Sequence, residues 1–272
     1  MSTLLILNLV LVPLLIGGVT LAARHWGPSV GGWLSSFPVI SAPILISIAL
    51  EHGGPFAASA AASTLSAVLA NLAFGVAYAW SATRFSWPTC LATGFTGYFL
   101  VVACLSLWAP SLYVAVPVVL IGLLLAPRLY PLPVPTAQPA GEPVNDIFWR
   151  MGTGVLLVFL VTHFASGLGP RLSGSFAMFP VLAPILAVFS HRQSGPAFAI
   201  HLLRGMVLGY YSFAVFCIVL SQMLPATSIK NAFLVSLGCA LLVQVVSRIC
   251  LHRARTSTAM RAQQATSTIA SR

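Results

Sequence analysis

One stretch of the sequence occurs twice, and this internal repeat constrains the fold more than any other feature. Residues 27–55 read GPSVGGWLSSFPVISAPILISIALEHGGP, and residues 169–196 read GPRLSGSFAMFPVLAPILAVFSHRQSGP. Both copies begin with Gly-Pro, carry a Phe-Pro pair and a further proline inside an apolar run, and end with Gly-Pro. Such a repeat indicates a chain built from two related units.

The composition indicates which solvent these units face. Of the 272 residues, 58% are hydrophobic and only 6% are charged, and the apolar runs have the length of about 20 residues that crosses a bilayer. Lys and Arg number 13 against 3 Asp and Glu. The basic residues are spread singly near the ends of the runs, which is typical of topology signals and not of nucleic-acid binding. The sequence therefore predicts an all-α, multi-pass membrane protein with the lipid bilayer as partner and no nucleic acid.

Apolar runs punctuated by Gly, Pro and charged residues predict about nine transmembrane helices. A Pro-rich linker follows the fifth, with Asp146 as a helix N-cap after it, and the polar, basic tail at 251–272 is predicted to be disordered. The first run has no positive residues before it, so we interpret it as a span and not as a cleaved signal peptide. The expected spans are about 3–23, 29–50, 55–80, 88–109, 111–127, 147–167, 172–190, 196–223 and 229–250.

The distribution of positive charge favours this odd number of spans. With nine spans, 11 of the 13 basic residues fall on one side of the membrane, and only Arg171 and Lys230 fall on the other. Positive residues favour the cytoplasmic side. We therefore expect a protein of the bacterial inner membrane with a periplasmic N-terminus and a cytoplasmic C-terminus.

The two copies of the repeat fall on the second and seventh spans, so they are expected to cross the membrane in opposite directions. Inverted repeats with Gly/Pro-broken helices at matching positions indicate a transporter site between the repeats. This predicts a 4+1+4 architecture. Its parts are a first four-helix repeat at 1–110, an adaptor helix at 111–127, a linker at 128–146, an inverted second repeat at 147–250 and a tail at 251–272.

The prolines of the repeat interrupt helical hydrogen bonding. Pro38 and Pro43 free the carbonyls four residues earlier, and Pro180 and Pro184 do the same in the second copy. In the bilayer an unpaired backbone carbonyl needs a neighbouring helix, water or a ligand as its partner. Two interpretations stay open: a solute site at broken helices, or structural kinks that duplication copied.

The ionisable residues narrow the class of solute. The acids Glu51, Glu142 and Asp146 all lie in loops or at helix ends, so a cation pathway has no carboxylate within a span, and a neutral or anionic solute fits better. Arg204 lies about two turns into the span 196–223, with His201 on a similar face. Arg204 either extends to the cytoplasmic headgroups or contacts an anion in a cavity.

The sequence has no HExxH and no CxxC, so neither of these zinc-binding patterns is present, and we expect no enzymatic activity, cofactor or metal ion. The favoured function is secondary transport of a small neutral or anionic solute by alternating access between the repeats. The alternative is a non-transporting membrane component of envelope or polysaccharide assembly, and a homo-oligomer is compatible with both. The candidate substrate-binding residues are Phe37, Pro38, Pro43, Phe179, Pro180, Pro184, Arg204 and His201.

The second copy and the helix after it, FPVLAPILAVFSHRQSGPAFAIHLLRGMVLGYYSFAVFCIVL, resemble the GlpM-like small inner-membrane proteins. In that family a Phe-Pro in a Gly-flanked helix precedes a polar turn and a long helix. The resemblance covers about 148–250 and, more weakly, the first half. It implies two four-span units fused through the fifth span and no catalytic residues. Glu51 and His52 replace the basic turn His191-Arg192 in the first half, so the two copies would not share a role for that turn.

Overall fold

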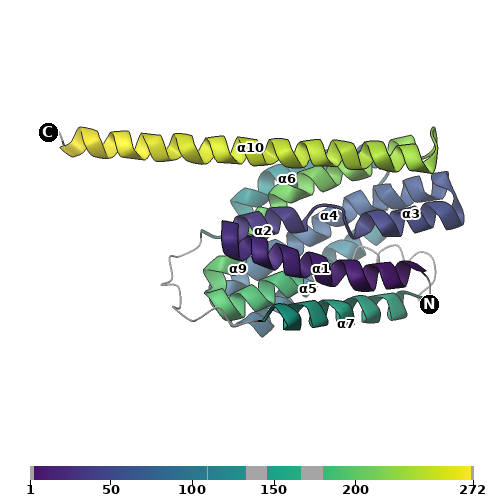
Figure 1. Cartoon of the computed structure of the whole chain (residues 1–272), viewed down its shortest axis with the longest axis horizontal. Coiled ribbons are helices and arrows are strands. Elements are labelled where there is room, and N and C mark those ends of the chain that lie inside the picture. The colour runs from purple at the N-terminus through teal and green to yellow at the C-terminus, as the bar shows by residue number, and fades with distance from the viewer. Residues whose placement is uncertain (1–2, 109, 133–145, 167–179, 271–272) are drawn as a thin grey trace.

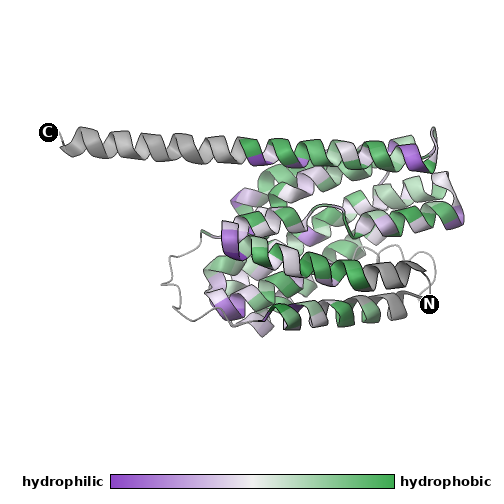
Figure 2. Cartoon of the chain, in the orientation of Figure 1, coloured by the Kyte–Doolittle hydropathy of each residue, from purple (hydrophilic) through white to green (hydrophobic). Residues whose placement is uncertain are grey.

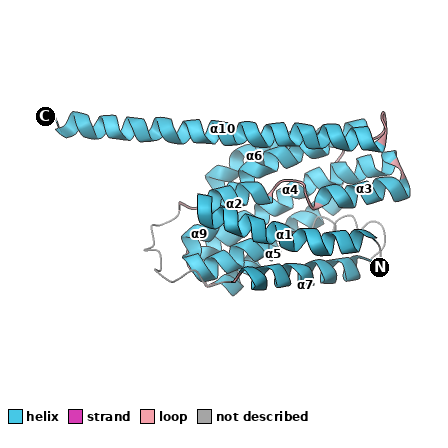
Figure 3. Cartoon of the chain, viewed as in Figure 1, coloured by secondary structure: helices cyan, strands magenta, loops and turns pink. Residues whose placement is uncertain are grey.

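The computed structural model describes residues 3–108, 110–132, 146–166 and 180–270. Every regular element in these ranges is a helix, as Figure 3 shows, so the prediction of an all-α protein is confirmed for them. The helices are α1 (Thr3–Trp26), α2 (Pro28–Ser35), α3 (Ser41–His52), α4 (Gly54–Ala82), α5 (Trp87–Trp108), α6 (Leu112–Leu129), α7 (Ile147–Ser166), α9 (Leu182–Met223) and α10 (Ile229–Ala270).

Several of these helices have the length and apolar composition of membrane spans. Within the described ranges there are five: α4, α5, α6, α9 and the first half of α10. Shorter apolar helices occupy Val10–Trp26, Ser41–His52 and Ile147–Leu157. Hydrophobic residues predominate along most of the helices (Figure 2). Many large apolar side chains are exposed on the outside of the bundle, for instance Leu107, which is 88% exposed. Apolar helices of this length with an apolar outer surface are typical of membrane spans, and the chain is a multi-pass membrane protein.

The helices run roughly along the long axis of the bundle (Figure 1), and side-chain contacts define its two ends. A hydrogen bond from Arg24 to Gln193 joins the end of α1 to α9. The Arg192 guanidinium lies 5.6 Å from the centre of the ring of Trp87, the first residue of α5.

 This end therefore holds the C-terminal end of α1, the N-terminal end of α5 and the part of α9 around residue 193.

The ends of α4 and α6 and the start of α7 lie at the same end of the bundle. The indole Nε1 of Trp80 donates a hydrogen bond to the Leu129 carbonyl at 2.7 Å, which joins the ends of α4 and α6, and Trp87 follows α4 after a short turn. Arg24 pairs with Asp146 directly before α7. We call this the arginine end because it gathers Arg24, Arg84, Arg128, Arg150 and Arg192.

The other end of the bundle contains the turn between α3 and α4. A Cβ atom added to Gly54 would lie 2.6 Å from the carbonyl oxygen of Leu224, so the start of α4 and the end of α9 are in contact. Ser111, at the start of α6, lines a groove with residues of both helices. The turn at Gly53 and the break at Gly195 therefore lie at opposite ends of the bundle.

Helix α9 forms the centre of the bundle. Gly195 has φ 84° and ψ 173°, a conformation that divides α9 into segments 182–194 and 196–223. Fully buried side chains such as Leu186, Leu203 and Phe216 line both segments, and α9 packs against α2, α4 and α10. The expected boundary of a span at residue 196 agrees with this break.

The C-terminal tail differs from its prediction. The tail was expected to be disordered, whereas α10 continues as a helix to Ala270 and projects beyond the bundle (Figure 1). No Gly or Pro occurs between residues 251 and 270, so nothing in the backbone interrupts the helix that the membrane segment begins. Most of the Pro-rich linker, at 133–145, lies outside the described residues.

Candidate functional site

The first copy of the repeat forms a broken helix. α2 ends at Ser35 and α3 begins at Ser41, with the Phe-Pro pair in the turn between them. Phe37 is half-buried and Pro38 is buried, while Pro43 lies half-buried in the first turn of α3. The Leu34 carbonyl, expected to be freed by Pro38, accepts a hydrogen bond from the Phe37 N–H at 3.3 Å. The helix thus ends before the proline, and the turn itself satisfies that carbonyl.

Side chains satisfy the neighbouring carbonyls at the end of α2. The hydroxyls of Ser35 and Ser36 donate to the Gly32 carbonyl at 2.8 and 3.3 Å. The amide Nε2 of Gln244, on α10, donates to the Trp33 carbonyl at 2.8 Å, and the Ser212 hydroxyl of α9 donates to the Oε1 of the same glutamine. These bonds satisfy the backbone without a ligand, as the structural-kink interpretation requires.

Glycines bring the backbones of α2 and α9 into direct contact. A Cβ atom at Gly32 would lie 1.9 Å from the carbonyl oxygen of Leu202, and one at Gly209 would lie 2.4 Å from the Trp33 carbonyl oxygen. The Ser36 hydroxyl adds a hydrogen bond to the Met206 carbonyl at 3.0 Å. Close backbone approach through small residues is typical of helix packing in membranes. The broken helix therefore rests on the segment 196–223 of α9.

The second copy is described only from Pro180 onward. Pro180 and Pro184 are both buried, whereas Phe179 lies outside the described residues, so its predicted role stays a prediction. Positive φ occurs at Gly53 and at Gly195, at 86° and 84°. The sequence repeat pairs Gly195 with Gly54, and the backbone turn pairs it with Gly53, so the turn is offset by one residue between the copies.

Arg204 and His201 have different surroundings although they share a helix face. His201 is exposed, and Arg204 is half-buried on α9. Tyr130, which directly follows α6, is only 6% exposed, and its hydroxyl packs against Gly75 of α4, where an added Cβ atom would lie 2.2 Å from it. Sequence reasoning missed Tyr130 because it lies just outside an expected span, next to the linker.

A second polar cluster, also missed from the sequence, lies at the arginine end. Asp146 pairs with Arg24 of α1 and, at 2.9 Å, with Arg150 of α7. Arg150 is only 3% exposed. It also donates to the Ser190 hydroxyl at 3.4 Å and to the Gln193 amide oxygen at 3.1 Å, both in α9. Asp146 directly precedes α7, as predicted, and its backbone carbonyl accepts a hydrogen bond from the Arg150 N–H at 2.9 Å. Its carboxylate pairs with arginines of α1 and α7, and these arginines in turn bond to α9. The i,i+4 spacing of Asp146 and Arg150 was the available signal.

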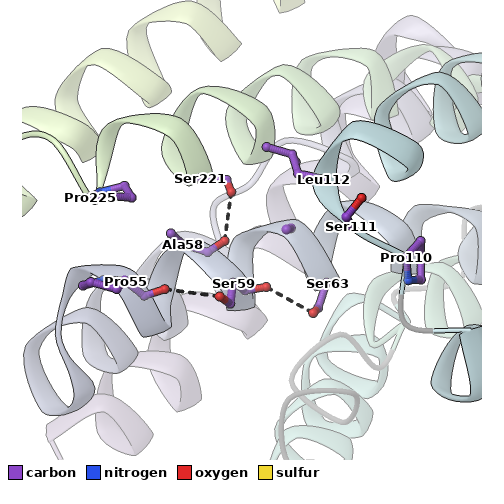
Figure 4. A pocket seen from close by; sticks show the side chains of 10 residues that line it. Pro55, Ala58, Ser59, Ser63, Pro110, Ser111, Leu112, Ser221 and Pro225 are labelled. Atoms are coloured by element: carbon purple, nitrogen blue, oxygen red, sulfur yellow. Dashed lines mark hydrogen bonds between the residues drawn. The ribbon is translucent and has the colours of Figure 1, made fainter.

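A groove with a volume of about 400 Å³ opens at the end opposite the arginine cluster, between α4, α6 and α9 (Figure 4). Its polar groups are serine hydroxyls, several of which bond to backbone carbonyls: Ser59 to Pro55 at 3.3 Å and Ser221 to Ala58 at 3.0 Å. None of the predicted substrate-binding residues lines it. Within the described residues, no group of three or more His, Cys, Asp or Glu side chains could hold a metal ion.

Comparison with known proteins adds no family to this picture: no family model, curated protein or solved structure matches the chain. The resemblance to GlpM-like proteins therefore stays a prediction. The fold and its apolar surface define a polytopic membrane protein, and its function has to be argued from the geometry of the helices.

Proposed function

We propose that this protein is a secondary transporter of a small neutral or anionic solute, working by alternating access between two inverted four-helix units joined by α6. In this proposal nine helices cross the inner membrane of a bacterium. The N-terminus lies in the periplasm, and the arginine end and the C-terminus face the cytoplasm.

The observation that carries the proposal is the contact between the broken helix and α9. α2 meets the segment 196–223 of α9 through close backbone approaches at Gly32, Gly205 and Gly209, so no side chain separates the two helices at these positions. Contacts of this kind permit small rotations and shifts of one helix against another. The turns at Gly53 and Gly195, which end corresponding parts of the two copies, lie at opposite ends of the bundle, as inverted units require.

The distribution of charge supports the orientation. Five arginines lie at the arginine end. Among the residues that the structure describes, the opposite end carries Lys230, at the start of α10. The positive-inside rule then favours a cytoplasmic arginine end. Single cysteines replacing Glu51 and Arg192 in a chain without native cysteines should label from the periplasm and from the cytoplasm, respectively. Labelling of both from one side would contradict the inverted arrangement.

Uptake into proteoliposomes tests the transport function. Solutes that raise the melting temperature of the purified protein are selected first, and their uptake is then measured with radiolabel. We expect Phe37→Ala and Arg204→Gln to reduce uptake at least tenfold, and the exposed-site controls Phe85→Ala and Arg128→Gln to transport normally. Normal uptake by the first pair would contradict the site. No uptake of any solute, with a fixed partner co-purifying, would favour a component of envelope or polysaccharide assembly.

A further inference from the structure

Three consecutive residues of α9, at 191–193, each contact a different helix of the proposed first unit. The His191 Nδ1 and the Tyr78 hydroxyl of α4 are hydrogen-bonded at 3.2 Å, and the Tyr78 side chain is fully buried. The Arg192 guanidinium lies over the ring of Trp87 of α5. The first two residues therefore connect α9 to two neighbouring helices at the arginine end.

The third residue, Gln193, connects α9 to α1. Its amide oxygen accepts hydrogen bonds from Arg24 at 3.2 Å and from Arg150 at 3.1 Å. Arg24 also pairs with Asp146, directly before α7. The bonds of Arg24 therefore cross from the first unit to the second. We call the contacts of residues 191–193 with the first unit the latch, which consists of His191 with Tyr78, Arg192 with Trp87 and Gln193 with Arg24.

The turn that ends the first copy of the repeat, at the opposite end of the bundle, makes contacts of another kind. Leu50, Glu51 and His52 are all exposed. Glu51 accepts a hydrogen bond from Ser47 of the same helix at 2.8 Å, and the His52 ring lies 4.9 Å from that of Phe56, at the start of α4. Both contacts stay within the first unit, whereas the side chains of the latch join the two units.

The space between the units also differs at the two ends. The groove of about 400 Å³ lies at the end opposite the latch, where α4 and α6 meet α9, and Pro55 of the first turn lines it. In alternating access, rocking of one repeat against the other opens the two ends in turn. A latch at the arginine end together with a groove at the other end corresponds to a state that is closed at the arginine end.

A hinge lies directly beside the latch. Gly195 has a φ of 84°, and no atom lies within 4 Å of a Cβ added there. A single residue at the end of an element can absorb the backbone rotation of a hinge movement. Arg150, which is only 3% exposed, bonds to both Ser190 and Gln193, so α7 and the segment 182–194 of α9 would move together.

We propose that residues 191–193 form the gate at the arginine end: the latch holds this end closed by binding α1, α4 and α5, and it opens by bending at Gly195. The inference rests on the proposed transport function, because it assigns the step by which that function would alternate between the two sides of the membrane. The movement itself is measurable without any solute.

The test follows the exposure of Cys90, which is fully buried on α5 about one turn after Trp87. With Cys90 as the only cysteine, the protein in nanodiscs is treated with a polar maleimide, whose reaction rate follows the population of the open state. We expect Arg24→Gln and His191→Ala to raise this rate about tenfold, equivalent to about 1.4 kcal/mol. The control Arg128→Gln, exposed at the same end, should leave the rate unchanged.

A second reporter distinguishes opening of the latch from general loosening of the bundle. Ser63→Cys, as the only cysteine, is exposed in the groove at the opposite end. Release of the latch should slow its reaction, because the groove closes when the arginine end opens. An unchanged rate at Cys90 in both latch variants, or faster reaction of both reporters, would overturn the inference.

Cross-linking separates the latch from the transport function. Arg24→Cys and Gln193→Cys are joined by a reversible methanethiosulfonate cross-linker, which holds the arginine end closed. Solute uptake that stops on cross-linking and returns on reduction would support the latch. Uptake that continues after cross-linking would overturn the latch and leave transport intact. Opposite changes of the two reporters in a protein that takes up no solute would support the movement and contradict transport.

Discussion

The contact between α2 and α9 can be tested with a single methyl group. Gly32→Ala places a Cβ atom 1.9 Å from the Leu202 carbonyl oxygen and 2.8 Å from the Met206 nitrogen, whereas ordinary contact begins at 3.4 Å. Both obstacles are backbone atoms, so no side-chain rotation can relieve the clash. The helices would have to separate by about 1.5 Å, the difference between 3.4 and 1.9 Å. Overpacking of this kind costs about 1 to 3 kcal/mol, occasionally more.

Separation of the helices would also stretch the hydrogen bonds from Ser36 to Met206 and from Gln244 to Trp33, at about 1 kcal/mol each. Against this stands a gain of about 1 kcal/mol in helix propensity from Gly to Ala. We therefore expect Gly32→Ala to lower the free energy of unfolding by about 3 kcal/mol.

Unfolding is measured by titrating the protein in mixed micelles with sodium dodecyl sulfate and following tryptophan fluorescence. The control is Gly238→Ala on α10, where no atom lies within 4 Å of an added Cβ, and it should unfold like wild type or slightly later. Gly209→Ala, which meets the Trp33 carbonyl oxygen at 2.4 Å, should behave like Gly32→Ala. If Gly32→Ala and Gly238→Ala unfold at the same detergent fraction, the backbone contact and the argument for movement at this interface are wrong.

Three further substitutions test other parts of the structure by the same unfolding titration. Gln244→Leu should cost about 1 to 3 kcal/mol because the partly buried Trp33 carbonyl loses its side-chain donor, while Gln222→Leu at an exposed position should have little effect. Asp146→Asn should cost about 3 kcal/mol because two arginines lose their counter-charge; a result within error of wild type would contradict the buried ion cluster. Gly195→Ala should cost about 1 to 3 kcal/mol from backbone strain alone, since φ is 84° and no atom lies within 4 Å, and an unchanged titration would mean that this break does not exist.

Much of the helical architecture follows from the sequence because each span depends on local properties. The length of an apolar run, the proline or glycine that ends it and the charge beside it are read within about 20 residues. The expected spans at 55–80, 88–109, 111–127 and 196–223 therefore agree closely with α4, α5, α6 and the second part of α9. The polar composition beyond residue 250 predicted disorder, but α10 continues to Ala270 because no Gly or Pro in this stretch ends the helix.

The partners of polar groups could not be read in this way, because they depend on which helices meet. The sequence indicates that Pro38 interrupts a helix, but only the packing of α10 provides Gln244 for the Trp33 carbonyl. Likewise, Asp146 is recognisable as a residue before a helix, whereas its second arginine comes from α1, 122 positions away.

The sequence by itself determined that this chain is a membrane protein, that its helices break at glycines and prolines, and that few charged residues lie within the spans. These properties are fixed by transfer free energies and backbone geometry, which act locally. The tertiary structure decided how close α2 comes to α9 and which side chains pair with Asp146. Such distances result from the simultaneous packing of several helices, so residues as remote in the chain as Trp33 and Gln244 become neighbours only in the folded bundle.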